Sequence, residues 1–346
     1  MNASFQRLMA AATRLTRAGD LHRATAAIQA ALGGAAAPVA NSDACVIDVE
    51  AREVETDAPA TAAPVPHAGQ FIAGSHTEAG SSREYKLYVP PGYRGQALPL
   101  VVMLHGCTQD PDDFAAGTGM NDVALERDFF VLYPAQAPHA NASRCWSWFK
   151  HNHQRRGRGE PALLAGMTRD VTKRYKIDAH RVYVAGLSAG GAMAAILGAE
   201  YLELFAAVGV HSGLPPGAAT DIQSAFAAMK HGTVTASTRR TPPTIVFHGD
   251  QDATVHPVNG EQVVAGCEGA AEPETERARS DNGRAYTRRI YRDPRGRVVA
   301  EHWSVHGAGH AWSGGSARGS YTDAKGPDAT DEMLRFFFAH ALHTAG

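Results

Sequence analysis

Residues 181–193 read Arg-Val-Tyr-Val-Ala-Gly-Leu-Ser-Ala-Gly-Gly-Ala-Met, and this stretch decides the fold. Its first five residues, β-branched and aromatic, are typical of a short buried strand, and residues 189–197 have helix composition apart from two glycines. Strand, Gly-x-Ser-x-Gly and helix in this order are typical of a nucleophile elbow, in which flanking glycines spare the strained turn a collision with Cβ atoms. The stretch therefore predicts Ser188 as a nucleophile.

Two later strand-like segments end in loops that carry carboxylate and imidazole groups. Residues 242–255 form an apolar run that ends in a Gly-Asp loop with Asp250 and Asp252. Residues 301–312 begin with strand-like alternation and continue into a Gly-rich loop that contains His310. Open α/β sheets place their sites just beyond the carboxyl ends of strands, so these loops are expected to lie near Ser188.

The chemistry explains why these residue types are needed together. A serine hydroxyl is a weak nucleophile, so an imidazole must accept its proton, and a carboxylate must orient that imidazole. We assign Ser188 as nucleophile, His310 as general base and acid, and Asp252 as the orienting acid. Ser, Asp and His in this chain order are typical of α/β-hydrolases.

Three residues are alternatives for these roles. Asp250 could be the acid, but a residue directly after the Gly249 turn more often stabilises its own loop. His306 and His248 could be the base, although His306 lies close to its strand and His248 within its own. His310 lies in a Gly-flanked loop that can extend across the sheet.

An oxyanion hole must accompany the triad, because it stabilises the charge that develops on the ester carbonyl. One donor is expected to be the backbone N–H of Ala189 at the helix start. The second is expected in the loop 105–109, which follows the apolar strand 100–104. The N–H of Cys107 is the preferred candidate, and that of Thr108 is the alternative.

Several spaced motifs together resemble the polyhydroxybutyrate (PHB) depolymerase family of esterases. They are residues 104–109 (Leu-His-Gly-Cys-Thr-Gln), 145–149 (Cys-Trp-Ser-Trp-Phe), 181–193, 211–213, 248–252 and 309–312. The resemblance extends from about residue 70 to the end and implies a serine esterase acting on polyhydroxyalkanoate-like or other carboxylic esters. It implies the same Ser188, Asp252 and His310. Feruloyl or acetyl esters of plant polysaccharide, and acyl transfer to an alcohol through the same triad, are the alternatives; a non-catalytic binding protein is a further one.

Alternating strands and helices predict an α/β fold with a mainly parallel, doubly wound sheet and helices on both faces. The remaining strands are expected at 85–89, 129–133 and 206–210, and helices at 163–175 and 332–342. Residues 69–346 are expected to form this catalytic domain. Residues 1–33 show helical spacing of apolar side chains and predict an amphipathic extension, and residues 34–68 have linker composition.

Composition bounds the partners. The chain has 346 residues, 44% of them hydrophobic, and a net charge of −2, which gives no reason to expect nucleic acid as a partner. No apolar run approaches the roughly 20 residues of a membrane span. Residues 8–12 are too short for the apolar core of a secretory signal, so the sequence itself indicates the cytoplasm, whereas family members acting on polymer are often extracellular. The expected partner is the ester substrate; no cofactor is expected, and the oligomeric state is not indicated.

The remaining candidates concern the walls of the site. Trp146, Trp148, Trp312 and His105 are candidates for substrate binding, with core packing as the alternative for each tryptophan. A disulfide between Cys107 and Cys145 would clamp two walls of a cleft; free thiols are the alternative, and a reducing compartment would favour them. Two further cysteines, Cys45 and Cys267, have no evident partner. His151 and His153 lack a third ligand, so no metal site is expected, and residues 155–159, rich in arginine, are interpreted as solvated.

Overall fold

The computed structural model describes residues 69–233, 240–267, 272–281 and 283–342. The predicted N-terminal helices (1–33) and linker (34–68) lie outside the described residues. Within these ranges, no helix is long and apolar enough to cross a membrane.

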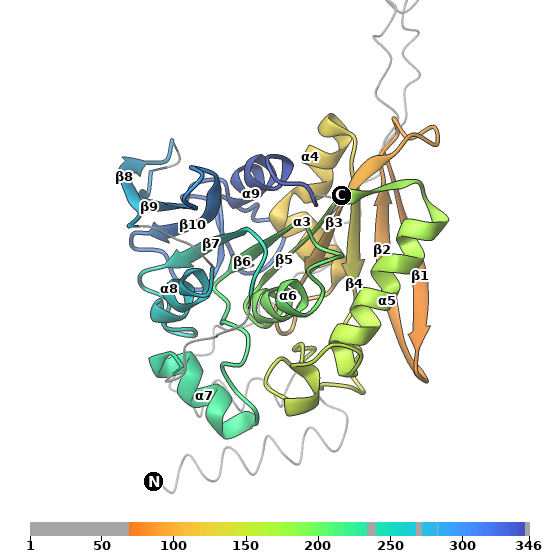
Figure 1. Ribbon diagram of the computed structural model, residues 1–346, viewed down its shortest axis with the longest axis horizontal. Helices are drawn as coiled ribbons and strands as arrows, with labels where there is room; N and C mark the ends of the chain where they lie inside the picture. The colour runs from red at the N-terminus through yellow and green to blue at the C-terminus, as the bar shows by residue number, and fades with distance from the viewer. Residues whose placement is uncertain (1–68, 234–239, 268–271, 282, 343–346) are drawn as a thin grey trace, which may run out of the picture. The chain divides into compact units, whose positions relative to one another are not determined.

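The described chain is built on one ten-stranded sheet (Figure 1). In spatial order its strands are β1 (Gln70–Glu78), β2 (Ser81–Val89), β4 (Phe130–Pro134), β3 (Leu98–Leu104), β5 (Ile177–Leu187), β6 (Ala207–His211), β7 (Thr244–Gly249), β10 (Val298–Val305), β9 (Ala285–Arg292) and β8 (Glu274–Arg279). The six central strands from β4 to β10 are parallel, and the two strands at each edge are antiparallel. All six central strands therefore end at the same edge of the sheet.

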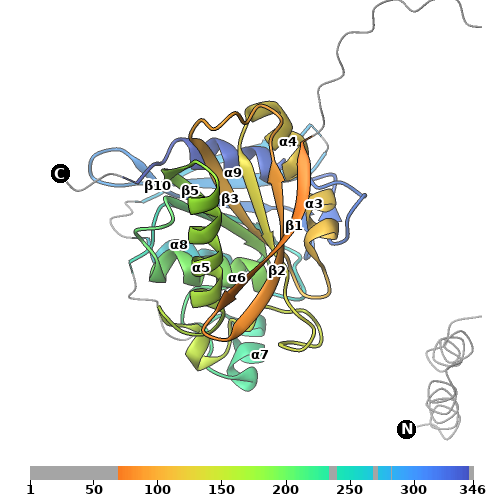
Figure 2. The same ribbon diagram turned by 90° about the vertical axis from the view of Figure 1, so that its right-hand side faces the viewer.

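Helices cover both faces of this sheet. The helices are α3 (Pro111–Thr118), α4 (Met120–Arg127), α5 (Gly159–Arg174), α6 (Ala189–Glu200), α7 (Ile222–His231), α8 (Val258–Ala265) and α9 (Ala329–Phe338), with a short 3₁₀ turn at His151–His153. Seen from the β1 edge, α5 and α6 lie on one side of the sheet and α3 and α4 on the other (Figure 2). The predicted doubly wound α/β architecture is confirmed.

Strand β3 shows how the sequence produces two cores. Because side chains alternate across a strand, Leu100, Val102 and Leu104 pack with α5 and α6, whereas Val101 and Met103 pack with α3, α4 and α9. All five side chains are fully buried. Full burial of each stabilises the fold by about 1.5–3 kcal/mol, which explains why a parallel strand is apolar throughout.

The predicted strands are confirmed as β2, β4 and β6, and the predicted helices as α5 and α9. Helix α9 begins earlier than expected because the Asp328 side chain caps it by accepting from the N–H of Asp331. The antiparallel β8–β9 hairpin was not anticipated. Strand β8 reads Glu-Thr-Glu-Arg-Ala-Arg and is exposed throughout, so it lacks the apolar alternation by which strands are recognised.

Candidate active site

Ser188 lies in a sharp turn between β5 and α6, with a backbone φ of 58°. Two glycines make this turn possible. A Cβ on Gly186 would lie 2.4 Å from the carbonyl carbon of Gly190, and a Cβ on Gly190 would lie 2.0 Å from the oxygen of Leu104. Any larger residue at either position would push the helix away from the sheet, which is the steric reason for the Gly-x-Ser-x-Gly pattern.

Asp252 and His310 meet at the same edge of the sheet. The His310 Nδ1 lies 2.7 Å from the Asp252 Oδ2, and the other carboxylate oxygen accepts from the N–H groups of Thr254 and Val255 at 2.9 Å each. The Asp252 side chain is fully buried, whereas that of His310 is 13% exposed. The imidazole of His310 therefore lies between a buried carboxylate and solvent.

A second imidazole lies on the same carboxylate. His248 Nε2 is 3.4 Å from Asp252 Oδ2 and 2.8 Å from the carbonyl oxygen of Val255. Burial by itself raises the pKa of Asp252, but hydrogen bonds from His248 and His310 outweigh it and hold the pKa well below its ordinary value. Asp252 is thus an anion at neutral pH, as the orienting acid of a triad must be.

Asp250, the alternative acid, forms a different pair. Its Oδ2 lies 2.9 Å from Nδ1 of His306, and its Oδ1 accepts from the N–H of Gly307 at 2.7 Å. The other ring nitrogen of His306 lies 2.9 Å from the Thr287 hydroxyl. Both nitrogens of His306 are therefore engaged, whereas His310 has a hydrogen bond at Nδ1 and no partner for Nε2 among the described residues.

His211 connects the serine turn to the segment after His310. Its carbonyl oxygen accepts from the N–H of Ser188 at 2.8 Å, and its Nε2 accepts from the N–H of Ser313 at 2.9 Å. Burial, with smaller contributions from His248 and His310, lowers the pKa of His211 to about 3, so the ring stays neutral. Sequence reasoning gave His211 no role; its position directly after strand 206–210 was the available signal.

The loop after β3 lies against the serine turn. This is seen from Gly106, where an added Cβ would be only 3.7 Å from the Cβ of Ser188. The N–H of Thr108 donates to the carbonyl of Ser143 at 2.7 Å, and that of Gly106 donates to the Gln109 side chain at 2.9 Å. Among the described residues, none accepts from the N–H of Cys107. This N–H is therefore available to an oxyanion, whereas that of the alternative, Thr108, is occupied.

The N–H of Ala189 belongs to the first turn of α6, where N–H groups have no acceptor within the helix. The helix dipole adds positive potential at this end. On the other side, the sulfur atoms of Cys107 and Cys145 are joined in a disulfide, so the loop after β3 is tied to the Trp-rich segment. Of the other cysteines, Cys267 is free and buried, and Cys45 lies outside the described residues.

The tryptophans are core residues. Trp146 is 0% exposed and Trp148 5% exposed, and both pack in the core on the α5–α6 face. Trp312 is 1% exposed; its ring stacks on His211 at 5.1 Å, and its Nε1 donates to Thr330 at 3.0 Å. None of these rings offers a face to a ligand, so we do not retain them as substrate-binding residues.

His105 is also buried, at 1% exposure. Its Nε2 accepts from the N–H of Gln136 at 3.1 Å, so its Nδ1 carries the proton and donates to the carbonyl of Gly106 at 2.7 Å. Burial lowers the pKa of His105 and keeps the ring neutral. The geometry gives His105 a part in holding the peptide whose N–H belongs to Cys107, rather than in contacting substrate.

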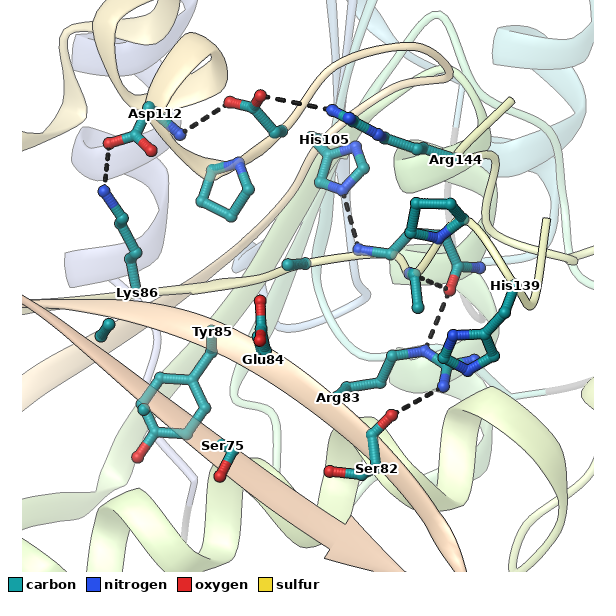
Figure 3. A pocket seen from close by; sticks show the side chains of 18 residues that line it. Ser75, Ser82, Arg83, Glu84, Tyr85, Lys86, His105, Asp112, His139 and Arg144 are labelled. Carbon is teal, nitrogen blue, oxygen red and sulfur yellow. Dashed lines mark hydrogen bonds and ion pairs between the residues drawn. The ribbon is translucent and has the colours of Figure 1, made fainter. Parts of the chain in front are cut away.

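His105 is one of the residues that line a cavity of about 830 Å³ (Figure 3). Its walls come from the β1–β2 hairpin, the loop after β4 and the start of α3, and none of Ser188, Asp252 and His310 lines it. Four of the charged side chains in its wall form two ion pairs, Lys86 with Asp112 at 2.5 Å and Arg144 with Asp110 at 3.4 Å. This cavity therefore lies apart from the predicted triad.

Two other segments have local partners. His153 Nδ1 lies 3.4 Å from Glu160, and the described residues contain no group of three His, Cys, Asp or Glu that could hold a metal. In the arginine-rich segment 155–159, Arg156 pairs with Glu203 at 2.6 Å. Both sides of that ion pair are about half exposed, so it contributes little to stability.

A serine turn at the end of a central parallel strand, with the Asp–His pair on loops of later strands, is the arrangement of the α/β-hydrolases, and the fold places the chain in this class. The acetyl xylan esterase from Aspergillus awamori shares this fold, with a TM-score of 0.59 and 22% identity over 74% of this chain and 94% of that one. The family described as "Esterase PHB depolymerase" matches residues 83–268, more than half of the chain. The chain belongs to this family of esterases.

Three relatives by sequence are named as depolymerases or esterases. Poly(3-hydroxyalkanoate) depolymerase C from Paucimonas lemoignei is 30% identical over 69% of this chain and 60% of its own length. Poly(3-hydroxybutyrate) depolymerase from Ralstonia pickettii is 32% identical over 65% of this chain and 50% of its own. A probable acetylxylan esterase A from Aspergillus fumigatus is 28% identical over 46% of this chain and 48% of its own. The chain thus covers 60% and 50% of the lengths of these two depolymerases.

Proposed function

We propose that this chain hydrolyses carboxylic esters of the hydroxyalkanoate type through a triad of Ser188, His310 and Asp252. The observation that carries the proposal is the 2.7 Å contact between His310 and the buried, ionised Asp252, at the sheet edge where the Ser188 turn lies. Membership in the PHB depolymerase esterase family supports the choice of ester hydrolysis.

In the first step, Ser188 Oγ attacks the ester carbonyl carbon while His310 Nε2 accepts the hydroxyl proton. The carbonyl oxygen becomes an oxyanion held by the N–H groups of Ala189 and Cys107. Asp252 stabilises the imidazolium without taking a proton from it. When the tetrahedral intermediate collapses, the bond to the alcohol oxygen breaks and His310 protonates the departing alkoxide.

In the second step, water attacks the acyl-enzyme carbonyl and gives a proton to the same imidazole. Collapse breaks the bond to Ser188 Oγ, which recovers its proton from His310, and the carboxylic acid leaves. The imidazole can alternate between base and acid because Asp252 holds its Nδ1–H throughout.

Hydroxyalkanoate esters are the preferred substrate class, since two of the relatives are named for polyhydroxyalkanoate or polyhydroxybutyrate. Acetyl esters of polysaccharide are the second candidate, supported by the similarity to acetylxylan esterase A. Both classes of ester react at a carbonyl and pass through an acyl-enzyme. They differ in the acyl and alcohol groups that the enzyme must accept.

A panel of esters separates the two candidates. Purified protein would be assayed on p-nitrophenyl esters of rising acyl length, soluble 3-hydroxybutyrate oligomers, amorphous polymer, methyl ferulate and acetylated xylan. Preference for 3-hydroxybutyrate esters supports the proposal, and preference for acetylated xylan supports the second candidate. Adding a competing alcohol shows whether the acyl group is transferred to it rather than to water.

The Ser188→Ala variant is the control for the mechanism. It should lose turnover by about 10⁶-fold while keeping the wild-type unfolding transition, since the change removes one partly exposed hydroxyl. Turnover of the variant near the wild-type rate would exclude Ser188 as the nucleophile.

A further inference from the structure

Tyr321 is a large side chain that the fold leaves 47% exposed. Its carbonyl oxygen accepts from the N–H of Trp312 at 2.7 Å, two residues beyond His310. Among the described residues, the other exposed large hydrophobic side chains are Ile222 and Phe226, both on α7. Tyr321 was not singled out from the sequence, since it lies in a polar Gly- and Ser-rich stretch.

The phenol of Tyr321 reaches the loop that carries the oxyanion donor. Its oxygen lies 3.1 Å from the Thr108 hydroxyl, which donates to the carbonyl of Cys107 at 2.6 Å. Because Thr108 has one hydroxyl proton and gives it to Cys107, the Tyr321 hydroxyl must be the donor between the two. Tyr321 thus connects the segment after His310, through Thr108, to Cys107, whose N–H is the proposed oxyanion donor.

Both residues of this bridge have strained backbones. Thr108 has a φ of 66° and Tyr321 a φ of 52°, values that β-branched and bulky residues rarely adopt. Each such residue costs on the order of 1–3 kcal/mol and persists only where its surroundings hold it. The surroundings do so here, because Asp113 accepts from both the N–H (2.8 Å) and the hydroxyl (2.6 Å) of Ser320, next to Tyr321.

An exposed aromatic ring fixed at its hydroxyl, its carbonyl and its neighbouring residue gains little by burial within its own chain. Fixed aromatic side chains bind ligands with a small loss of conformational entropy. Because the hydroxyl is already given to Thr108, the surface that the ring offers is apolar. The ester carbonyl would lie at the N–H of Cys107, the residue next to Thr108, so a group attached to that carbonyl can reach the ring of Tyr321.

We propose that Tyr321 is a specificity-determining residue whose ring binds the apolar part of the acyl group. This inference rests on the proposed function and adds the residue that selects acyl length. The ring favours acyl groups with several carbons over acetyl, in line with hydroxyalkanoate rather than acetyl esters as substrates.

The test compares kcat/KM for p-nitrophenyl butyrate and acetate in the wild type and in Tyr321 variants. In Tyr321→Ala the butyrate-to-acetate ratio should fall about tenfold, the factor expected when two methylene groups lose an apolar contact. Tyr321→Phe should keep the ratio within about twofold, since it keeps the ring. Tyr321→Gly removes the ring and also relieves the positive φ, so it should show the same fall without a loss of folding.

Phe226→Ala on α7 is the matched control, because it also removes an exposed aromatic ring but one without a contact to the oxyanion loop. Its ratio should equal that of the wild type. An unchanged ratio in both Tyr321→Ala and Tyr321→Gly, or an equal fall in Phe226→Ala, would overturn the inference. Failure of the wild type to hydrolyse any ester would instead overturn the proposed function.

Discussion

At the scale of single residues, two Asp–His pairs lie on neighbouring loops, and their surroundings distinguish them. Asp252 is buried and receives hydrogen bonds from a partly exposed His310 and from two backbone N–H groups. Asp250 is about one third exposed, and its partner His306 also contacts Thr287. A general base needs a second ring nitrogen that is free to accept a proton. Of the two pairs, only Asp252–His310 leaves such a nitrogen without a partner among the described residues.

This difference predicts the outcome of two matched substitutions. Asp252→Asn keeps the shape but favours the wrong tautomer of His310, so kcat should fall by about 10³–10⁴-fold. Asp250→Asn removes a hydrogen-bonded anion from a loop and should leave kcat within about threefold of the wild type. Steady-state kinetics on one p-nitrophenyl ester measures both. Equal losses in the two variants would contradict the assignment of the acid.

Sequence order and strand ends were sufficient to select Ser188, Asp252 and His310 as candidates, because these constraints act along the chain. They could not show that Trp312 turns its ring into the core or that Tyr321 turns outward. Both residues lie in the same Gly-rich region after His310, and the direction of each side chain depends on contacts with α3, α9 and the loop after β3.

At the scale of elements, the loop after β3 depends on its disulfide. Cys107 lies in this loop, and Cys145 lies 38 residues further along the chain. Such a cross-link stabilises a fold by about 2–4 kcal/mol, chiefly by restricting the unfolded chain in the usual account. Because Cys107 also supplies the proposed oxyanion N–H, loss of the cross-link should affect both stability and turnover.

The Cys107→Ser/Cys145→Ser double variant tests this expectation. Its free energy of unfolding should be lower by about 2–4 kcal/mol. Under conditions where the variant is still folded, its kcat should be several-fold lower than that of the wild type. Urea unfolding and ester turnover at 25 °C measure the two effects. Cys267→Ala is the control, since it removes a free thiol remote from the loop. A double variant with wild-type stability and kcat would show that the cross-link has neither role.

The elements themselves were predictable where the apolar pattern is strong. Strand β3 and the start of α6 are apolar on all sides because they are covered on all sides. The β8–β9 hairpin escaped prediction because strand β8 is exposed throughout and is held to β9 by cross-strand pairs such as Arg288 with Glu276, at 3.2 Å, rather than by burial. Ion pairs between strands leave no periodic signal in a single sequence.

At the scale of the whole molecule, several histidines lie buried in the interior. Burial, with a further contribution from His248, lowers the pKa of both His211 and His302 to about 3. His302 is 2% exposed, and neither ring nitrogen has a hydrogen-bond partner among the described residues. Both rings are neutral in the folded protein at pH values where the unfolded chain binds protons.

This arrangement predicts a loss of stability in mild acid. Between about pH 6.5 and pH 3 each of the two histidines is protonated in the unfolded chain but neutral in the fold, so unfolding takes up protons. The free energy of unfolding should therefore fall as pH falls, by about 1.4 kcal/mol per pH unit for each histidine. The pKa values of Asp252, Glu160 and Glu301 are also lowered in the fold, so these carboxylates bind protons more readily in the unfolded chain. They therefore extend the fall in the free energy of unfolding to pH values below the ordinary carboxyl range.

Urea unfolding at pH 7.5, 6.5, 5.5 and 4.5 measures this slope, and His302→Leu isolates the contribution of one histidine. Leucine has a similar volume and no polar atoms, so the variant should match or exceed the wild-type stability at pH 7.5, because no buried group is left unsatisfied. Its slope between pH 6.5 and 4.5 should be smaller by about 1.4 kcal/mol per unit, the contribution of one proton. An unchanged slope in the variant would mean that His302 binds its proton equally well in the folded and the unfolded protein. Burial of His302 would then not be a cause of the loss of stability in acid.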